Sequence, residues 1–509
     1  MLLIHPPVCK PCEPPPGIAR LAGALDQFNI ASSVWDANLE GLLWLMHQVP
    51  GASDTWTRRA ERHCNEHLDL LRNRRGYDQL GRYGKAVGDL NRLLDQAGKA
   101  YGARPGLSNF AHDEWSPVRS GDLVRAAGAP EASPFFPFFS EEMLSRVCKE
   151  AQAVVGFSLN FLSQALTTFA MIGFLRREMP SIRIVLGGGL VTSWMRRPAW
   201  RNPFDGLVDA MVDGPGESRL LSFLRGEATS VGHVTPDYAP FVLNRYLSPG
   251  LILPYSTSSG CYWNRCSFCP EKAEGNPYVP IRPDRVRGDL ESLVAKTAPV
   301  LIHFVDSALS PSLLEGLCQH PPGVPWHGFT RITKHLTDEQ FCKDLRRSGC
   351  VMLELGVESG SQEVLECEGK GTRIEEISKA LRNLRKAGIG TYVYLLFGTP
   401  SESETEARQT LEFTTRHHEC IDFLNVAIFN LPINGKDAQF LETKGHYEAD
   451  LSLYTGFRHP KGWHRGKVRQ FIDKEFKRQP VLAAILRRDP PHFTSNHAAF
   501  FCRSWPSAL

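Results

Sequence analysis

The chain has 509 residues, which exceeds what one ordinary hydrophobic core can hold, so two or three domains are expected. Hydrophobic residues (42%) and charged residues (22%) have the balance of a soluble globular protein, and a net charge of +3 gives no argument for a nucleic-acid partner. No apolar run approaches the roughly 18 residues that a membrane span needs. The thirteen cysteines are odd in number and no secretory signal opens the chain, so reduced thiols in the cytoplasm are expected.

The first part of the chain alternates short apolar runs with helical patterns. Strands are predicted at residues 2–4, 32–35, 153–157, 182–186 and 207–212, and helices at 17–28, at 164–178 and from 217 onward. This alternation predicts a parallel, doubly wound α/β sheet over residues 1–218. Residues 42–138 are polar and Arg-rich, and the stretch is longer than one ordinary crossover between two parallel strands needs. It is therefore predicted to be a helical insertion. A Pro-containing linker is expected at 219–250.

A second alternating series is predicted to form a domain over residues 251–430. Strands are predicted at residues 253–256, 300–305, 326–331, 352–357, 391–397 and 423–429, and helices at 285–296, 311–318, 338–347, 374–387 and 402–416. Six strands with helices between them predict a partial TIM-type (βα)6 barrel, whose chemistry lies at the carboxyl ends of the strands. Residues 431–509 are predicted to be a mixed C-terminal extension that forms a lid or a substrate platform.

Three cysteines, Cys261, Cys266 and Cys269, lie within nine residues just after the first predicted barrel strand. Three thiolates on one short loop fit an iron–sulfur cluster in which one iron has no protein ligand. A zinc site is one alternative, but zinc takes four ligands, and the next cysteine is Cys318, beyond a predicted strand and helix. Buried structural cysteines are the other alternative.

This loop resembles that of the radical S-adenosylmethionine (SAM) enzymes. Phe268 holds the aromatic position between the last two cysteines, which in that family packs near the adenine of SAM. The run Gly356–Ser361 resembles the strand-four motif, which implies that Glu358 and Ser359 contact the ribose and methionine parts of SAM.

Further residues extend the resemblance along the predicted barrel. Asp306 and Arg331 stand where the second and third predicted strands end, and the resemblance implies that they belong to the SAM site. Gly388 and Gly398 lie in runs that resemble the later glycine-rich motifs of the family.

The cysteine spacing departs from the commonest family pattern. Four residues separate Cys261 from Cys266, where that pattern has three, so the loop must bulge by one residue. The extra residue changes what Tyr262 and Trp263 pack against. The C-Y-W-x-x-C variant resembles one found in family members with a cobalamin-binding N-terminal domain.

The predicted N-terminal sheet resembles the flavodoxin-like (Rossmann-like) cobalamin-binding fold, in which ligands bind beyond the carboxyl ends of the strands. Glycines at those ends would let the backbone approach a large flat cofactor. The resemblance implies that the corrin is cradled by His5, Pro6, Ser158, Gly187, Gly188, Gly189, Gly214 and Glu217. A Rossmann-like adaptor without cobalamin is the alternative.

The run Asp36–Gly41 stands where cobalamin mutases and methyl carriers have D-x-H-x-x-G, whose histidine ligates cobalt. Asn38 takes the place of that histidine and is a poor cobalt ligand beside an imidazole. The resemblance therefore implies cobalamin held without a protein histidine, as in the radical subgroup. His5 could face cobalt, but we expect it to close a strand turn.

Together these features identify the chain as resembling the cobalamin-dependent radical SAM enzymes. The cofactors implied are a [4Fe–4S] cluster, SAM and methylcobalamin, with an external one-electron reductant of the flavodoxin or ferredoxin type. The implied reaction methylates an unactivated carbon of a small molecule, lipid or peptide by way of a deoxyadenosyl radical. A cyclisation, ring contraction or other rearrangement without methyl transfer is one alternative, and a cobalamin or redox sensor without turnover is another.

Overall fold

The computed structural model describes residues 1–49, 51, 54–149, 153–198, 200–444, 449–489 and 497–504. Small parts of the predicted helical insertion and of the predicted C-terminal extension lie outside these described residues. The chain divides into two units: the first comprises Met1–Ile252 together with residues 449–453, and the second comprises most of the chain from Leu253 onward.

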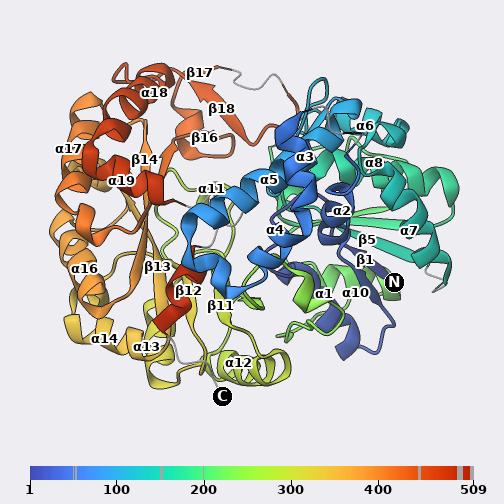
Figure 1. The fold of residues 1–509 in the computed structure, drawn as a ribbon, viewed down its shortest axis with the longest axis horizontal. Coiled ribbons are helices and arrows are strands. Elements are labelled where there is room, and N and C mark those ends of the chain that lie inside the picture. The colour runs from blue at the N-terminus through green and yellow to red at the C-terminus, as the bar shows by residue number, and fades with distance from the viewer. Residues whose placement is uncertain are drawn as a thin grey trace. The chain divides into compact units, whose positions relative to one another are not determined.

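A five-stranded parallel sheet forms the centre of the first unit (Figure 1). Its strands are β1 (Leu2–Ile4), β2 (Ser33–Trp35), β5 (Val154–Ser158), β6 (Arg183–Gly187) and β7 (Ala210–Val212). Their order is β2-β1-β5-β6-β7, and every pairing is parallel. Counted within this sheet, the order is 2-1-3-4-5, which is the flavodoxin-like order of doubly wound sheets. The predicted α/β class of this unit is confirmed.

The helices that lie between strands of this sheet in the sequence include α1 (Pro16–Gln27), α2 (Ala37–Leu45), α8 (Leu162–Glu178) and α9 (Gly189–Met195). Helix α10 (Glu217–Arg225) follows the last strand, β7. Helix α1 begins with Pro16, whose fixed φ suits a first helical position. Helix α2 begins after Asp36, whose carboxylate accepts a hydrogen bond from the backbone N–H of Leu39 at 2.9 Å. The Asp36 cap starts α2 directly after β2, whereas an eleven-residue loop separates β1 from α1.

The stretch predicted as a helical insertion also contains a hairpin. Its helices are α3 (Thr55–Arg62), α4 (Cys64–Leu71), α5 (Leu80–Gly98) and α6 (Ser120–Gly128), and α7 (Phe136–Lys149) follows. Strands β3 (Ala103–Pro105) and β4 (Phe110–His112) pair antiparallel, and three-residue strands of this kind leave too little periodic pattern to predict.

The stretch predicted as a linker packs onto the first unit. The backbone N–H of Asp237 donates to the Ala19 carbonyl at 2.9 Å, and the N–H of Leu247 donates to the Pro11 carbonyl at 2.8 Å. The prolines of this stretch therefore shape an irregular but attached segment.

The second unit is built on a six-stranded sheet. Its strands are β8 (Ile252–Tyr255), β11 (Leu301–Leu309), β12 (Trp326–Thr330), β13 (Cys350–Glu358), β14 (Gly390–Phe397) and β15 (Phe423–Ile428). They lie in sequential order, and the pairings from β11 to β15 are parallel. The helices between them are α12 (Pro283–Thr297), α13 (Pro311–Gln319), α14 (Glu339–Arg347), α16 (Ile374–Ala387) and α17 (Glu404–Arg416). This arrangement confirms the predicted partial (βα)6 barrel.

Shorter elements complete the second unit. They are β9 (Ser258–Ser259), β10 (Val279–Pro280), α11 (Pro270–Ala273), α15 (Gln362–Cys367), β16 (Leu431–Pro432), β17 (Thr443–Lys444), β18 (Tyr454–Phe457), α18 (Arg465–Lys474) and α19 (Pro480–Arg488). The C-terminal extension packs on the barrel: the rings of Phe397 and Phe471 lie 6.0 Å apart, and His497 stacks on Tyr392 at 4.7 Å.

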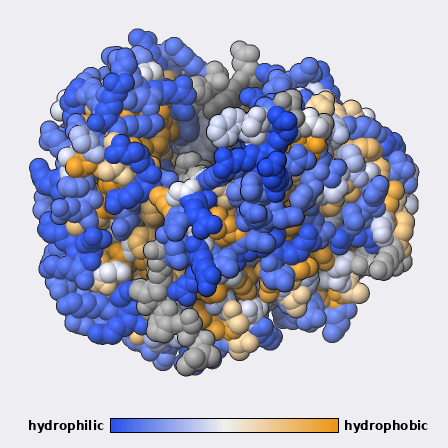
Figure 2. Space-filling view, in the orientation of Figure 1, coloured by the Kyte–Doolittle hydropathy of each residue, from blue (hydrophilic) through white to orange (hydrophobic). Residues whose placement is uncertain are grey.

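Burial of the strands accounts for the core of both units. Eight of the nine residues of β13 are buried, as in a strand covered on both faces, whereas the surface in view is mainly hydrophilic with smaller hydrophobic areas (Figure 2). Within the described residues, each helix is too short or too polar to span a bilayer.

A buried carboxylate marks the turn after β14. Glu402 accepts hydrogen bonds from the backbone N–H of Gly398 and from Trp463 Nε1, the latter at 3.0 Å. Burial raises the pKa of Glu402 to about 8, and the neighbouring carboxylates Glu406 and Glu368 act in the same direction. The folded protein therefore holds this side chain neutral at pH values where the unfolded chain ionises it.

This raised pKa predicts a pH-dependent stability. Since the folded-state pKa lies above the unfolded value of 4.5, the contribution is fully present below pH 4.5 and is lost as the pH rises through about 8. Glu402→Gln keeps the shape of the side chain but cannot ionise. The melting temperature of this variant minus that of wild type should therefore be higher at pH 9 than at pH 6. Asp473→Asn, at an exposed carboxylate paired with Lys477, is the control and should show no such trend. Equal differences at both pH values for Glu402→Gln would contradict the assignment.

Candidate active site

The three cysteines lie on the loop between β9 and α11. Gly260, just before Cys261, has φ +69, and a Cβ there would come 2.4 Å from the Pro277 carbonyl oxygen. Helix α11 begins at Pro270, directly after Cys269. Cys266 is buried and the other two thiols are half-buried. The tight glycine turn and the short helix thus hold the loop at both ends.

The electrostatic setting of the thiols favours a shared centre. Burial raises the pKa of Cys266, while Lys370 and Arg331 lower it; burial also raises the pKa of Cys269, which the N–H groups of α11 lower. The three thiols lie on one loop of nine residues. Among the described residues they nevertheless do not form a group whose ligand atoms all lie within 4.8 Å. Three thiols on one short loop fit an iron–sulfur cluster in which one iron has no protein ligand.

The segment Glu368–Gly371, after α15, supports the cysteine loop. Trp263 Nε1 donates to the Gly369 carbonyl at 2.9 Å, and the Ser267 N–H donates to the Glu368 carbonyl at 3.0 Å. A Cβ at Gly371, where φ is +67, would lie 2.1 Å from the Trp263 ring. The bulge predicted from the extra loop residue is therefore filled by Trp263, which packs against this segment.

Glu358 lies at the end of β13 with φ +66, a rare conformation for a residue other than glycine. Its carboxylate accepts from Lys370 Nζ at 2.8 Å, and their side chains are only 16% and 4% exposed. Ser359 is buried, and its hydroxyl lies 3.1 Å from Thr410 Oγ1 on α17. The predicted E-S-G-S run thus brings Glu358 to the barrel end, while Ser359 packs inward.

Sequence reasoning missed Lys370, which carries the cation of this pair. The pattern Gly369-Lys370-Gly371 between two helices was the available signal. Two closely spaced glycines mark a place where the backbone is approached closely, and here Trp263 makes that approach.

Asp306 and Arg331 both contact the region of the cysteine loop, in different ways. Asp306 is buried and accepts from the Thr257 N–H at 2.9 Å and from Ser258 Oγ at 2.6 Å; burial raises its pKa. It therefore anchors the segment that leads into the loop. Arg331 is buried, and its guanidinium lies 3.8 Å from the centroid of the Trp263 ring.

Phe268, which was also predicted to lie at the SAM site, is close to Lys370. Its ring lies 5.7 Å from Lys370 Nζ. Gly398 follows β14 with φ +81 and packs against Val468. Gly388 precedes β14 and caps α16 at the opposite end of the strand, with no atom near its Cβ position. In this structure Gly388 is a helix cap, remote from the carboxyl ends of the strands.

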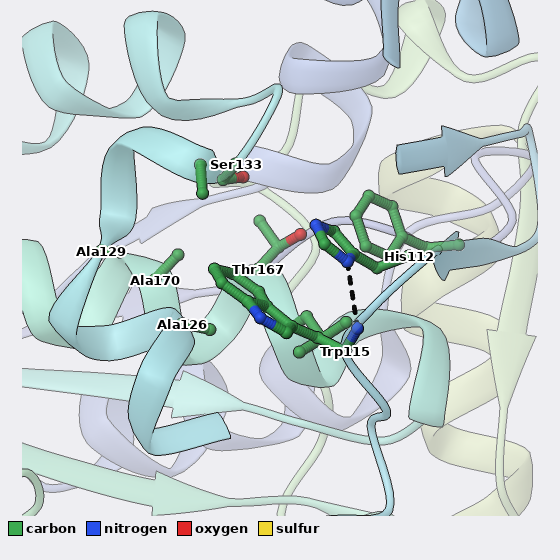
Figure 3. A pocket seen from close by; sticks show the side chains of 10 residues that line it. His112, Trp115, Ala126, Ala129, Ser133, Thr167 and Ala170 are labelled. Atoms are coloured by element: carbon green, nitrogen blue, oxygen red, sulfur yellow. Dashed lines mark hydrogen bonds between the residues drawn. The ribbon is translucent and has the colours of Figure 1, made fainter. Parts of the chain in front are cut away.

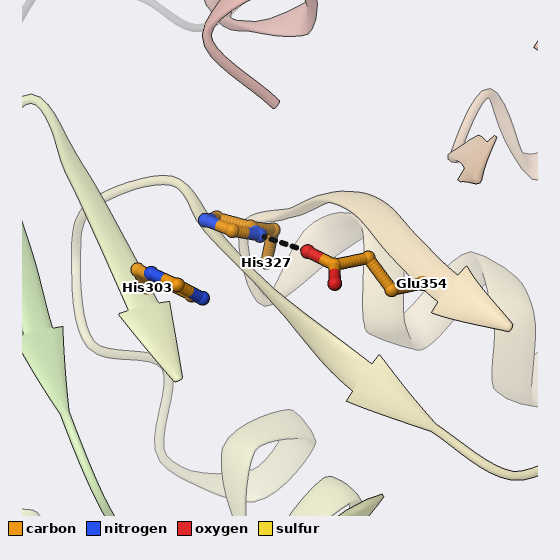
Figure 4. A group of neighbouring side chains, drawn as sticks. All are labelled: His303, His327 and Glu354. Carbon is orange, nitrogen blue, oxygen red and sulfur yellow. Dashed lines mark hydrogen bonds and ion pairs between the residues drawn. The ribbon is translucent and has the colours of Figure 1, made fainter. Parts of the chain in front are cut away.

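A second polar group crosses the barrel strands and was not predicted, because single His and Glu residues in strands form no motif. His303 and His327 stack with centroids 4.4 Å apart, and His327 Nδ1 lies 3.2 Å from Glu354 Oε1 (Figure 4). Tyr394 OH donates to the other Glu354 oxygen at 3.3 Å.

This group is a hydrogen-bonded charge cluster rather than a ligand sphere. Burial raises the pKa of Glu354, but the hydrogen bond and charge of His327 outweigh it, so the pKa is lowered overall. The ligand atoms of the three side chains lie within 4.8 Å, yet the two rings are only 16° from parallel. A metal ion lies in the plane of each imidazole that binds it, and stacked rings share no such point.

In the first unit, the residues that follow β1 and β2 hold a buried loop. His5 Nε2 lies 2.9 Å from Cys9 Sγ, and Asn38 Oδ1 accepts from the Cys9 N–H at 2.7 Å. Burial lowers the pKa of His5. Pro6 accepts from Gln164 through its carbonyl at 2.7 Å. These groups therefore hold the loop that follows β1 in place.

Asp36 and Glu217 are also engaged within the protein. Asp36 accepts from Tyr246 OH at 2.6 Å besides capping α2. Glu217 is buried and pairs with Arg20 at 2.7 Å. The Gly214 N–H donates to Thr192 Oγ1 at 2.9 Å. The polar side chains predicted near the corrin therefore have structural partners.

At the carboxyl ends of β5 and β6, glycine backbone rather than polar side chains is exposed to a ligand. Gly187 ends β6, and Gly188 has φ +115, where a Cβ would meet the Leu159 carbonyl oxygen at 2.4 Å. Gly189 begins α9, with its nearest neighbour 3.8 Å from a Cβ position. Beside them, Ser158 Oγ accepts from Asn160, and Phe161 is 55% exposed. Three glycines and one exposed ring could accept a flat ligand.

The first unit also contains two hollows. The larger, of about 580 Å³, is lined by apolar Leu43, Trp44 and Phe138 and by the cations Arg72 and Arg245. The smaller, of about 10 Å³, has room for a single water and is a packing void. It lies beside His112 and Trp115, whose rings stack at 4.6 Å, with alanines opposite (Figure 3).

Comparison with known proteins identifies the barrel. Residues 255–414 match the radical SAM superfamily. The matched part of the second unit is therefore a radical SAM domain, which implies a [4Fe–4S] cluster and SAM.

Two curated proteins are similar to this chain over about half of its length. Anaerobic magnesium-protoporphyrin IX monomethyl ester cyclase of Cereibacter sphaeroides is 25% identical over 287 residues, covering 47% of this chain and 44% of that protein. Bacteriochlorophyllide d C-12(1)-methyltransferase of Chlorobaculum tepidum is 28% identical over 258 residues, covering 45% and 54%. The chain spans about half the length of the curated relatives it matches.

A solved structure shares the fold of nearly the whole chain. The radical SAM methyltransferase TsrM of Kitasatospora setae, with tryptophan substrate and a SAM analog bound, superposes with a TM-score of 0.53 at 15% identity. The match covers 96% of this chain and 89% of that protein.

The packing of Trp263 on Gly371 yields a prediction. Gly371→Ala would place a Cβ 2.1 Å from the indole and displace the cysteine loop, so iron and sulfide per chain after anaerobic reconstitution should fall several-fold. Gly323→Ala is the matched control, since its φ of +78 carries the same backbone cost of about 1–2 kcal/mol but its surroundings are open. Equal iron contents in the two variants would show that this packing does not hold the loop.

Proposed function

We propose that the protein is a cobalamin-dependent radical SAM methyltransferase that methylates an unactivated carbon of a small molecule, lipid or peptide. The three-thiol loop at the end of a radical SAM barrel carries the proposal. It is joined to a unit with the flavodoxin-like strand order and a glycine-lined sheet edge. Two of the similar proteins are themselves named methyltransferases.

In this proposal Cys261, Cys266 and Cys269 hold the cluster. A cluster held there would supply the electron, drawn from an external flavodoxin- or ferredoxin-type reductant, that cleaves SAM reductively and allows hydrogen to be taken from the substrate carbon. Glu358 and Lys370 offer a carboxylate and an ammonium to the two ends of the SAM amino acid. Their shared burial excludes water and fixes both groups before SAM arrives.

The first unit would hold cobalamin at the β5 and β6 ends. Gly187, Gly188 and Gly189 let the backbone approach the corrin face, and Phe161 adds an exposed apolar ring. Asn38 is committed to the Cys9 N–H, which fits a corrin held without a ligand from this position. When bound, methylcobalamin supplies the methyl group.

One observation favours a second candidate. A similar protein is named a cyclase, so the same cofactors could serve a ring closure without methyl transfer. The mass of the product separates the two reactions, because methylation adds one carbon and two hydrogens.

A test of the proposal does not require the natural substrate. The reconstituted protein, given cobalamin, a low-potential reductant and SAM labelled with a CD3 group, should form CD3-cobalamin and 5′-deoxyadenosine, both detected by mass spectrometry. Cys266→Ala should abolish deoxyadenosine formation, because the thiolate trio is broken. Cys420→Ala, a half-buried thiol beside α17, should leave it unchanged. Deoxyadenosine without CD3-cobalamin would favour the second candidate, and neither product would reject both.

The glycine edge gives a separate prediction for cobalamin. Gly189→Val adds bulk where its own protein neighbours leave room, so the protein should fold but bind cobalamin at least tenfold more weakly. Gly121→Val, near the start of α6 and also in open space, is the matched control. The cobalamin retained after gel filtration, measured by absorbance, checks both variants. Equal retention would place the corrin elsewhere.

A further inference from the structure

Arg331 carries a buried charge without a carboxylate partner among the described residues. Arg331 is the first residue after β12, and only 5% of its surface is exposed. One terminal nitrogen donates to the Lys370 carbonyl, and within the described part of the chain Nε has no hydrogen-bond partner. Removing a charge from water is strongly unfavourable unless an opposite charge faces it. The surroundings of Arg331 are therefore suited to an anion that the protein does not supply as a carboxylate.

Trp263 fixes the position of this guanidinium. The distance of 3.8 Å between Arg331 Cζ and the ring centroid is that of a close cation–π stack. The ring in turn is held by its hydrogen bond to the Gly369 carbonyl and by the absence of a side chain at Gly371. Trp263 lies in the four-residue stretch between the first two cysteines, where the commonest family spacing has three.

The ring on which Arg331 stacks belongs to the cysteine loop, because Trp263 lies between Cys261 and Cys266. Lys370 also lies near this loop, with Nζ 5.7 Å from the Phe268 ring, but its charge is compensated by Glu358 at 2.8 Å. Of the two cations, Arg331 is the one left to balance a cluster.

We propose that Arg331, held by the positioning residue Trp263, is the counter-ion of the iron–sulfur cluster and raises its reduction potential. This inference rests on the proposed function, since it needs the three thiolates to hold a four-iron cluster. Reduction adds one negative charge to the cluster, so a fixed cation beside it favours the reduced form. Burial keeps water and salt from screening the effect.

The test compares two arginines that lie over the same indole. In the full-length reconstituted protein, Arg331→Gln should shift the ratio of reduced to oxidised cluster about tenfold at a given potential, which lowers the midpoint by about 59 mV for one electron. Arg265 also lies over the Trp263 ring, at 4.9 Å, but it is exposed. Arg265→Gln should therefore shift the ratio less than twofold. Redox titration followed by electron paramagnetic resonance measures both.

Conservative variants separate charge from shape. Arg331→Lys keeps the cation and should stay near the wild-type midpoint. Trp263→Leu removes the stack and should lower the midpoint, whereas Trp263→Phe retains an aromatic face and should restore much of it. If Arg331→Gln loses its cluster, iron content decides: retention in Arg331→Lys supports the counter-ion role, and loss in both variants overturns it.

Equal shifts in Arg331→Gln and Arg265→Gln would overturn the proposal. An unchanged midpoint in Trp263→Leu with full iron content would remove the positioning role of Trp263. These outcomes are independent of methyl transfer. A midpoint shift in a protein that forms no CD3-cobalamin counts against the proposed function alone, and the reverse pattern counts against the counter-ion alone.

Discussion

The contact between Trp263 and the Glu368–Gly371 segment fixes the cysteine loop to the barrel. The hydrogen bond from Trp263 to Gly369 joins residues 106 positions apart in the sequence. The thiols follow β8, whereas their support follows β13, so the site exists only when distant strands have assembled. A loop that would otherwise be a flexible connection thereby acquires the rigidity that an ordered cluster requires.

Polar groups at the strand ends are satisfied in different ways, and this difference separates structural from functional roles. Asp306 accepts hydrogen bonds from neighbouring hydroxyl and N–H groups, and Glu354 is balanced by His327. Glu358 is balanced by Lys370, but it also adopts a strained backbone at the barrel end. Arg331 alone among these is left with stacking and a carbonyl. Buried polar groups normally find partners, so the exception indicates where a charged cofactor belongs.

The sequence was sufficient to predict both sheets, the partial barrel and the radical SAM loop, because strand–helix alternation and cysteine spacing are local patterns. The roles of individual polar residues were harder to foresee. Glu217 is paired with Arg20, and Gly388 caps a helix, since both outcomes depend on which distant elements meet. Lys370 and the His327–Glu354 pair were missed for the same reason. The linker prediction failed to foresee that residues 219–250 pack onto the first unit through backbone hydrogen bonds, which leave no mark on side-chain patterns.

The first unit contains a short segment from the C-terminal part of the chain in addition to residues 1–252. Residues 449–453 return to it, where the Leu451 N–H donates to the Val118 carbonyl at 3.0 Å and Asp450 accepts from the Ser120 N–H at 2.9 Å. A fragment that ended at Ile252 would therefore lack a segment of chain that belongs to its own unit, so a gene fusion that exchanges the first unit has to carry residues 449–453 as well.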